Sequence, residues 1–319
     1  MANVVAFEHE VLNAPAQGTD AWLEWRKQGI TATEAGVIMH PAYKRSALTV
    51  YTDKLGITTP DQSDEEGYME WGHRIEDLLV GKFMETHPDF HDCTQGRLYQ
   101  WEWRKCSLDA QCFDGDGNPV VIECKTGQAL EKWDDGKIPE NYFAQVQWQM
   151  RITGIRRAFF SVLIQGHIYF EREVKYDPEY VDELEHRCRV VWDAIQIKTP
   201  PAIFGDGEAD KTAIAALAGE SGHTGEPQPI SDSDVAKFKE LKEAADKANN
   251  EFENFKNRLG FTMVETSKLM KSNGKVFASW VERKGSVTVD KALLQAKYPD
   301  VYEKVLKQGA GSRYIKYNP

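Results

Sequence analysis

Apolar residues recur along the chain with several different spacings, and each spacing predicts one kind of secondary-structure element. The apolar run Val120, Val121 and Ile122 follows a group of turn residues, 115–118, which predicts a hairpin whose second strand is buried. The spacing of residues 141–154 fits a helix on which Gln145 and Gln149 share one face. The chain should therefore contain both strands and helices.

The spacing of apolar residues changes in the last third of the chain. From Phe238 to Leu259, apolar residues recur at intervals of three and four and stop at Gly260, which predicts a heptad helix with a C-terminal stop signal. The apolar face of such a helix needs a surface to pack against, which could belong to another helix of this chain, another subunit or another protein. Beyond it we expect a hairpin at Asn273-Gly274, a helix near residues 290–306 and a last strand at 312–317.

Length and local composition suggest how the chain is divided. With 319 residues, of which 41% are hydrophobic, it can bury a full core and form two domains, or one domain with an extension. Residues 204–234 are rich in Gly, Ser, Asp and Glu and contain one short helical candidate, so we expect a linker there. The predicted organisation is a first domain at 1–203, a linker at 204–234 and an α+β extension at 235–319.

The N-terminal region and the cysteines suggest a cytoplasmic protein. Charged residues interrupt the apolar residues near the N-terminus, so we expect neither a signal peptide nor a membrane span. The cysteines are odd in number and lack CxxC spacing, which argues against a disulfide framework or a zinc site. Their positions are Cys93, Cys106, Cys112, Cys124 and Cys188. Reduced thiols are the expectation.

The charge of the chain is acidic and unevenly distributed. The net charge is −11, and residues 1–200 contain 21 Lys and Arg against 33 Asp and Glu. A protein that slides on phosphates would be expected to be basic, but an enzyme that encloses its substrate can place cations on an inner surface. Residues 264–319 hold 11 Lys and Arg against 5 Asp and Glu, mixed with aromatic residues, which fits either nucleic-acid contact or a solvated charged face.

The residues that carry chemistry are Asp109, Glu123 and Lys125. Glu123 and Lys125 are two positions apart on the predicted strand, so their side chains project from the same face, while Cys124 points away. If Asp109 lies at the end of the neighbouring strand, the three side chains converge. Two carboxylates can bind Mg²⁺, and a nearby ammonium can orient an attacking water, which together suit metal-assisted phosphodiester cleavage.

Three further segments accompany the two that contain Asp109, Glu123 and Lys125, in a recognisable order. The five segments are GTDAWLEWRKQGITATEAGVIM at 18–39, MEWGHRIEDLLVGKFME at 69–85, SLDA at 107–110, IECK at 122–125 and NYFAQVQWQMRITG at 141–154. The arrangement resembles the YqaJ-type viral recombinase nucleases, the phage lambda exonuclease family of the PD-(D/E)xK superfamily. The resemblance covers about residues 15 to 195. It implies an α/β (α+β) fold of the restriction-endonuclease-like type, in which helices flank a mixed β-sheet.

The resemblance implies a role for individual residues around the metal. Asp109 and Glu123 would bind the metal together with the main-chain carbonyl of Cys124, and Lys125 would position the nucleophilic water. Glu76 matches a helical acid that helps to hold a second ion. The expected cofactor is Mg²⁺, for which Mn²⁺ could substitute, with two ions in the site. Without the resemblance, a surface salt bridge with His73 or Arg74 would be the better explanation of Glu76.

Other matching positions lie beside the catalytic group. Gln145 matches a helix glutamine next to the site, with Tyr142 one turn earlier, and a polar face on a packed helix is the alternative for Gln145. We expect Gln149 to have only that packing role. Arg26 and Thr33 match positions that hold the 5′-terminal phosphate of DNA, although Arg26 could instead stack on the neighbouring tryptophans.

The function implied by the resemblance is a Mg²⁺-dependent 5′-to-3′ exonuclease on double-stranded DNA ends, which leaves 3′ single-stranded tails for phage-type recombination. A single-strand annealing protein would be its partner, and the family suggests a homotrimer. A restriction- or repair-type endonuclease would use the same ligands, and a non-catalytic DNA-end-binding protein is a third alternative. The host cytoplasm is the expected location.

Overall fold

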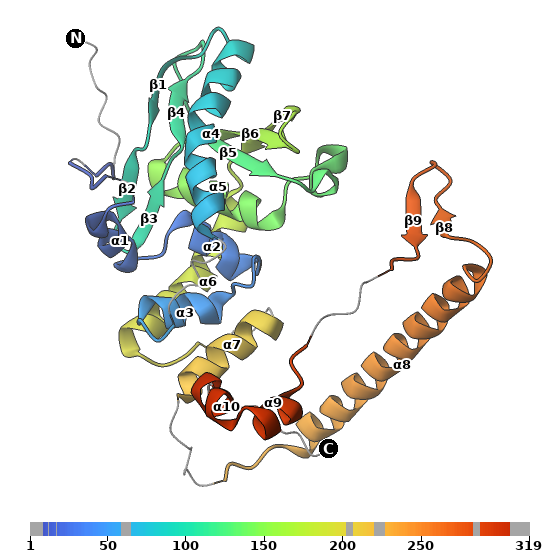
Figure 1. Ribbon diagram of the computed structural model, residues 1–319. Helices are drawn as coiled ribbons and strands as arrows, with labels where there is room; N and C mark the ends of the chain where they lie inside the picture. The colour runs from blue at the N-terminus through green and yellow to red at the C-terminus, as the bar shows by residue number, and fades with distance from the viewer. Residues whose placement is uncertain are drawn as a thin grey trace. The chain divides into compact units, whose positions relative to one another are not determined.

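The computed structural model describes residues 9–11, 13–16, 18–58, 65–201, 207–219, 227–282 and 288–306. The chain divides into two compact units, Met1–Ser221 and Gly222–Pro319. The first unit contains a central sheet with its helices, and the second contains a long helix, a hairpin and two short helices (Figure 1). In the described part of the chain, no helix has the length and apolar character needed to cross a membrane.

The first unit begins with three short helices that are each fixed by a side-chain cap. They are α1 (Asp20–Lys27), α2 (Ala32–Met39) and α3 (Ala47–Lys54). Thr19, Thr31 and Ser46 are the respective N-caps, and each side-chain oxygen accepts a hydrogen bond from a main-chain N–H of the first turn. These caps satisfy helix N–H groups that have no partner within the helix, so each short helix begins at a defined residue.

The central sheet has five strands in the order β1-β4-β5-β6-β7. Their bounds are β1 (His91–Gln95), β4 (Ala110–Phe113), β5 (Pro119–Gly127), β6 (Arg157–Ile164) and β7 (Ile168–Lys175). Strands β5 and β6 are parallel and are joined through helix α5 (Glu140–Thr153), whereas the other neighbours are antiparallel. The sheet is therefore mixed, as expected, and the predicted hairpin is formed by β4 and β5.

Helices cover the sheet on both faces, which confirms the expected fold class (Figure 1). Helix α4 (Glu65–Thr86) packs on one face, where Leu79 and Phe83 contact residues of β4 and β5. On the other face, α2, α3, α5 and α6 (Pro178–Ile197) form the larger core. A separate hairpin, β2 (Leu98–Trp101) with β3 (Arg104–Ser107), packs against α5. Two 3₁₀ turns, Leu130–Lys132 and Asp134–Gly136, precede α5.

Strand β5 supplies side chains alternately to the two faces. Val121 belongs to the core that contains α5, and Glu123 and Lys125 bond to a side chain of that helix. Ile122 and Cys124 belong to the core formed with α4. The prediction that Glu123 and Lys125 share a face, with Cys124 turned away, is therefore confirmed.

The segment expected as a linker includes an ordered helix, α7 (Gly207–Ala218). It packs against α3, and the Ser46 hydroxyl donates a 2.5 Å hydrogen bond to Asp210 Oδ1 in a buried position. Ala209 and Ala213 are also buried. The stretch up to Ala218 therefore belongs to the first unit, and the division between units lies after Ser221, later than the expected boundary.

The second unit contains α8 (Asp232–Thr262), the strands β8 (Lys268–Met270) and β9 (Val276–Ser279), and the helices α9 (Lys291–Lys297) and α10 (Pro299–Val305). The predicted hairpin at Asn273-Gly274 is confirmed. Helix α8 continues two residues beyond Gly260, and the single helix expected at 290–306 is divided before Pro299, whose ring does not allow an uninterrupted helix. The strand expected at 312–317 lies outside the described residues.

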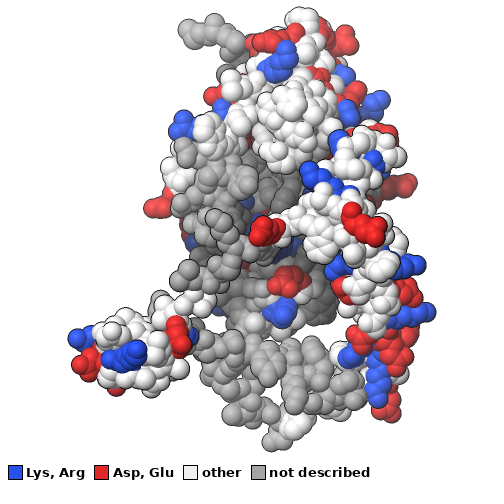
Figure 2. All heavy atoms as spheres, turned by 45° about the vertical axis from the view of Figure 1, so that its right-hand side comes forward, with Lys and Arg blue, Asp and Glu red and all other residues white. Residues whose placement is uncertain are grey.

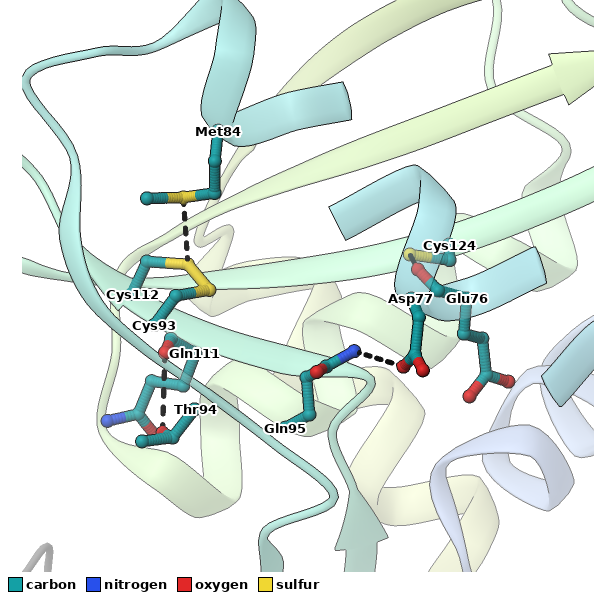
Figure 3. Close-up of a disulfide and its surroundings, with 9 residues drawn as sticks. All are labelled: Glu76, Asp77, Met84, Cys93, Thr94, Gln95, Gln111, Cys112 and Cys124. Atoms are coloured by element: carbon teal, nitrogen blue, oxygen red, sulfur yellow. Dashed lines mark hydrogen bonds between the residues drawn. A yellow bond between two sulfur atoms is a disulfide. The ribbon is translucent and has the colours of Figure 1, made fainter. Parts of the chain in front are cut away.

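The expectation that all cysteines are reduced is wrong for one pair. Cys93 on β1 and Cys112 on β4 form a disulfide next to Met84 (Figure 3). The two residues are 19 positions apart in sequence and meet because β1 and β4 are antiparallel neighbours. Cys106, Cys124 and Cys188 are buried free thiols.

Candidate active site

Three residues predicted from the sequence meet where β4 begins and β5 emerges from its pairing with β4. Asp109 directly precedes β4, and its Oδ2 accepts a 2.7 Å hydrogen bond from the main-chain N–H of Cys124. Lys125 Nζ lies 2.6 Å from Glu123 Oε1. Strand β4 pairs with β5 only as far as Ile122, so the next part of β5 is open on this side and receives the Asp109 side chain instead.

Glu123 is held by three donors at once. Its side chain is 3% exposed, and Oε1 accepts hydrogen bonds from Lys125 Nζ and from Gln145 Nε2, at 2.6 Å each. Oε2 accepts a 2.7 Å bond from Gln149 Nε2, which also donates to the Ser107 carbonyl. A buried carboxylate needs such donors because burial without them is costly. Gln145 therefore lies at the site as predicted.

The position of Gln149 differs from the prediction of a packing role. Its side chain has no exposed surface and contacts Glu123 directly. Gln147 does have a structural role, because its amide bonds the Lys175 carbonyl and the Asp177 N–H. The signal for Gln149 was present in the sequence, since it shares a helix face with Gln145, but its contact with Glu123 depends on the packing of α5 on β5.

Negative charge exceeds positive charge in this cluster. Burial, and then the neighbouring charge of Glu123, raise the pKa of Asp109 well above its usual value, and Glu76 adds to that effect. Burial alone would lower the pKa of Lys125, but Glu123 and Asp109 outweigh it, so the pKa of Lys125 is raised. Among these groups a single ammonium faces three carboxylates, and an additional cation would relieve the repulsion.

The donor atoms at this place fit a hard divalent cation. Asp109 and Glu123 supply carboxylate oxygens, and the Cys124 N–H points to Asp109. Both main-chain groups of a strand residue point to the same edge, so the Cys124 carbonyl also faces the Asp109 side. Within the described residues, no three His, Cys, Asp or Glu side chains form a ready-made cluster for a metal. The fit therefore depends on two carboxylates and this carbonyl.

Glu76 lies on α4, which crosses the other face of the sheet. Its main-chain carbonyl accepts a 3.8 Å contact from the Cys124 thiol, while its carboxylate points away from that thiol (Figure 3). The charge of Glu76 nevertheless acts on Asp109. Glu76 is thus at the edge of the cluster, where an acid could assist a second ion.

Arg26 and Thr33 lie on α1 and α2. The Arg26 guanidinium is 4.6 Å from the centre of the Trp22 ring, so the stacking considered for it is present. Lys54 Nζ donates to the Arg26 carbonyl at 2.6 Å and pairs with Glu34 at 2.8 Å, which ties the end of α1 to the first turn of α2. Thr33 is exposed in that first turn.

Helix α2 lies close to α5, the helix that carries Gln145. A Cβ atom on Gly36 would be 2.4 Å from the Asn141 carbonyl oxygen and 3.7 Å from Gln145 Cβ. Thr33 is one turn before Gly36 and shares its face, so it lies on the side of α2 that is turned to α5. The face of α2 that includes Thr33 and Gly36 therefore lies against the helix that carries Gln145.

Tyr142 lies under Lys125. Lys125 Nζ is 4.6 Å from the centre of the Tyr142 ring, a cation–π arrangement that favours the charged lysine. The Tyr142 hydroxyl contacts the hydroxyl of Tyr43, which comes from the loop between α2 and α3. Tyr142 is thus part of the group of contacts around Lys125.

Known proteins resemble this chain in sequence and in structure. Residues 21–156, which include every site residue predicted above, match the family model described as YqaJ-like viral recombinase domain. Over 308 residues the chain is 24% identical to the uncharacterized protein YqaJ of Bacillus subtilis (strain 168), with 91% of each chain covered.

Two solved structures are also similar. An alkaline exonuclease from Laribacter hongkongensis aligns with a TM-score of 0.46 at 19% identity, covering 56% of this chain and 94% of that one. A phage-related exonuclease from Haemophilus somnus 129PT aligns with a TM-score of 0.37 at 13% identity, covering 53% and 94%. The family match supports the resemblance drawn from the motifs: residues 21–156 of this chain are similar to the YqaJ-like viral recombinase domain.

Proposed function

We propose that this protein is a divalent-metal-dependent exonuclease that degrades double-stranded DNA from its 5′ ends and leaves 3′ single-stranded tails. The observation that carries the proposal is the convergence of Asp109, Glu123 and Lys125 at one edge of the sheet, with Gln145 bonded to both Glu123 and Lys125. These residues bring together carboxylate oxygens that can bind a divalent metal ion and the positively charged ammonium of Lys125, as metal-assisted phosphodiester hydrolysis requires.

Each residue has a distinct part in this proposal. Asp109, Glu123 and the Cys124 carbonyl would hold Mg²⁺, or Mn²⁺ in its place, and Glu76 would assist a second ion. When bound, the ion stabilises negative charge that develops on the scissile phosphate. Gln145 keeps the Glu123 carboxylate in one orientation. Lys125 donates hydrogen bonds to the attacking water and to the phosphate oxygens.

Binding of the DNA end is assigned to Arg26 and Thr33. A guanidinium offers paired donors to a phosphate, and the first turn of α2 adds main-chain N–H groups beside the Thr33 hydroxyl. On the face shown in Figure 2, Lys and Arg side chains of the described residues lie among Asp and Glu side chains instead of forming one basic band. Local cations are thus expected to matter more than the overall charge.

The first experiment tests the chemistry. End-labelled linear duplex should be degraded with Mg²⁺ and remain intact with a chelator, and Asp109→Ala, Glu123→Ala or Lys125→Ala should slow degradation by roughly a hundredfold or more. Asp116→Ala, in the exposed turn of the same hairpin, is the matched control and should keep full activity. Normal turnover by all three site variants would refute the proposal, and cutting of covalently closed circles would indicate an endonuclease instead.

The second experiment tests the end preference. Initial rates are compared on linear duplexes that carry either a 5′-phosphate or a 5′-hydroxyl, and the phosphorylated end should be degraded faster because a phosphate monoester carries more charge than a diester. Arg26→Ala should remove most of that preference. Lys27→Ala is the control, since Lys27 is 62% exposed on the same helix. Equal rates on the two kinds of 5′ end would refute the phosphate-binding role of Arg26, and digestion from the 3′ end would refute the 5′-to-3′ polarity.

The product also implies partners. A 3′ single-stranded tail is the substrate of a single-strand annealing protein, so we propose such a protein as the downstream partner, in recombination of the phage type. The homotrimer suggested by the family resemblance remains a prediction, to be tested by light scattering of the complete chain.

A further inference from the structure

The loop between α2 and α3 contains a strained two-residue turn. Ala42 and Arg45 exchange two main-chain hydrogen bonds of 3.1 and 2.9 Å, which enclose Tyr43 and Lys44. The φ angles of Tyr43 and Lys44 are 55° and 56°. A tight turn with two positive φ angles strongly favours Asn and Gly, and a bulky side chain in this conformation costs free energy. A reason other than local stability should therefore favour a tyrosine at position 43.

The position of the Tyr43 ring suggests why a tyrosine is favoured in this turn. Tyr43 is 66% exposed, yet its hydroxyl contacts the Tyr142 hydroxyl, and the two ring centres are 6.4 Å apart. The Tyr142 ring in turn lies under Lys125 Nζ at 4.6 Å and against Trp133 at 5.9 Å. Tyr43 is the exposed end of a row of aromatic rings that passes directly below the catalytic lysine.

The surroundings of Tyr43 suit a nucleic acid better than a protein core. The neighbouring Lys44 is exposed and makes no ion pair with the described residues, while Arg45 is paired with Asp53 at 3.1 Å. An exposed ring beside an unpaired cation offers a nucleobase a face to stack on and offers its phosphate a counter-charge. If the ring served only to pack, most of its surface would be buried.

We infer that Tyr43 stacks on a nucleobase adjacent to the scissile phosphate and so positions the DNA end over Lys125. The inference rests on the proposed nuclease function. It makes Tyr43 a positioning residue, since it touches the substrate base and not the reacting atoms. Stacking that contributes to binding of the reacting end would also offset the strain in the turn.

The test uses two substitutions that separate the ring from the turn. Tyr43→Asn removes the ring but places a residue that favours the positive φ angle, so the loop should fold at least as well. Tyr43→Phe keeps the ring and removes only the hydroxyl contact with Tyr142. Tyr298→Asn, at a 60% exposed tyrosine of the second unit, is the matched control.

The measurement is kcat/KM of each full-length protein on 5′-phosphorylated duplexes with a base or an abasic site at the first or the second nucleotide. The native protein, Tyr43→Phe and Tyr298→Asn should prefer the base-containing end at one of these positions by roughly 5- to 150-fold, the factor equivalent to about 1–3 kcal/mol of stacking. Tyr43→Asn should lose that preference. The ratio cancels any general loss of activity in a variant.

The outcomes separate this inference from the proposed function. If the native protein degrades DNA and Tyr43→Asn keeps the native ratio, stacking is refuted while the nuclease stands. If Tyr43→Phe loses the ratio as fully as Tyr43→Asn does, the hydroxyl contact and not the ring face is responsible, which also overturns the inference. If the native protein cleaves no DNA, both proposals fail together.

Discussion

Lys105 on β3 is a lysine without exposed surface, and replacing it with methionine should stabilise the protein at neutral pH. Its Nζ lies 3.0 Å from Gln100 Oε1 and 4.5 Å from the centre of the Trp25 ring. Gly29 leaves the space for this side chain, because a Cβ there would lie 2.8 Å from Lys105 Cε. Burial, and then the nearby charge of Lys54, lower the pKa of Lys105 to about 8 from a usual value of 10.5.

The size and the pH range of the effect follow from that pKa. The folded state binds this proton more weakly than the unfolded state, so at pH values below 8 the buried charge reduces the free energy of unfolding. At about 1.4 kcal/mol for each pKa unit, the reduction has an upper limit of about 3.5 kcal/mol. It disappears as the pH rises from about 8 to 10.5, because the lysine then loses its proton in both states.

Lys105→Met keeps the unbranched chain and removes the charge, so it should raise the free energy of unfolding by about 1–3 kcal/mol at pH 7. Urea unfolding of both proteins at pH 7 and pH 9.5 is the assay. The gain should shrink by more than half at the higher pH. Lys27→Met, at an exposed lysine of α1, should change little at either pH. A destabilised Lys105→Met protein at pH 7, or a gain that does not depend on pH, would refute this account of Lys105.

Two further predictions concern the site and its supporting helices. Gln149→Leu removes a charge-assisted hydrogen bond to Glu123. It should lower kcat roughly 10- to 100-fold with little change in KM for DNA. An unchanged kcat would show that Gln149 does not orient the Glu123 carboxylate. A chain that ends at Gly219 should keep the melting temperature of the first unit, whereas one that ends at Pro201 lacks α7 and exposes Ser46 and α3, so it should melt several degrees lower. Equal melting of the two shortened chains would contradict a stabilising role for α7.

The parts of the structure that were predicted correctly depend on neighbours in sequence. The turn residues before Val120 close the β4–β5 hairpin because Asp114 Oδ1 accepts hydrogen bonds from the main-chain N–H groups of Asp116 and Asn118. The common face of Glu123 and Lys125 follows from the period of a strand. Such local rules were sufficient to place these two site residues and the hairpin that carries one of them.

The parts that were missed depend on contacts between distant segments. Cys93 and Cys112 meet only because β1 pairs with β4, and nothing in their spacing indicates this register. Lys105 is buried because Gly29 and Trp25, more than seventy positions away in the chain, enclose it. The Ser-, Gly- and acid-rich composition of the expected linker indicated only one short helical candidate, whereas α7 is longer and packs against α3.

The close approach of α2 and α5 has a consequence for the length of the products. Gly36 allows the two helices to touch at the Asn141 carbonyl, close to Gln145. If the terminal phosphate is held by α2 and the bond is cut beside α5, the gap between the two helices acts as a molecular ruler. The number of nucleotides released in each cycle would then be determined by how closely the backbones of α2 and α5 pack. A single added methyl group at Gly36 would change that number.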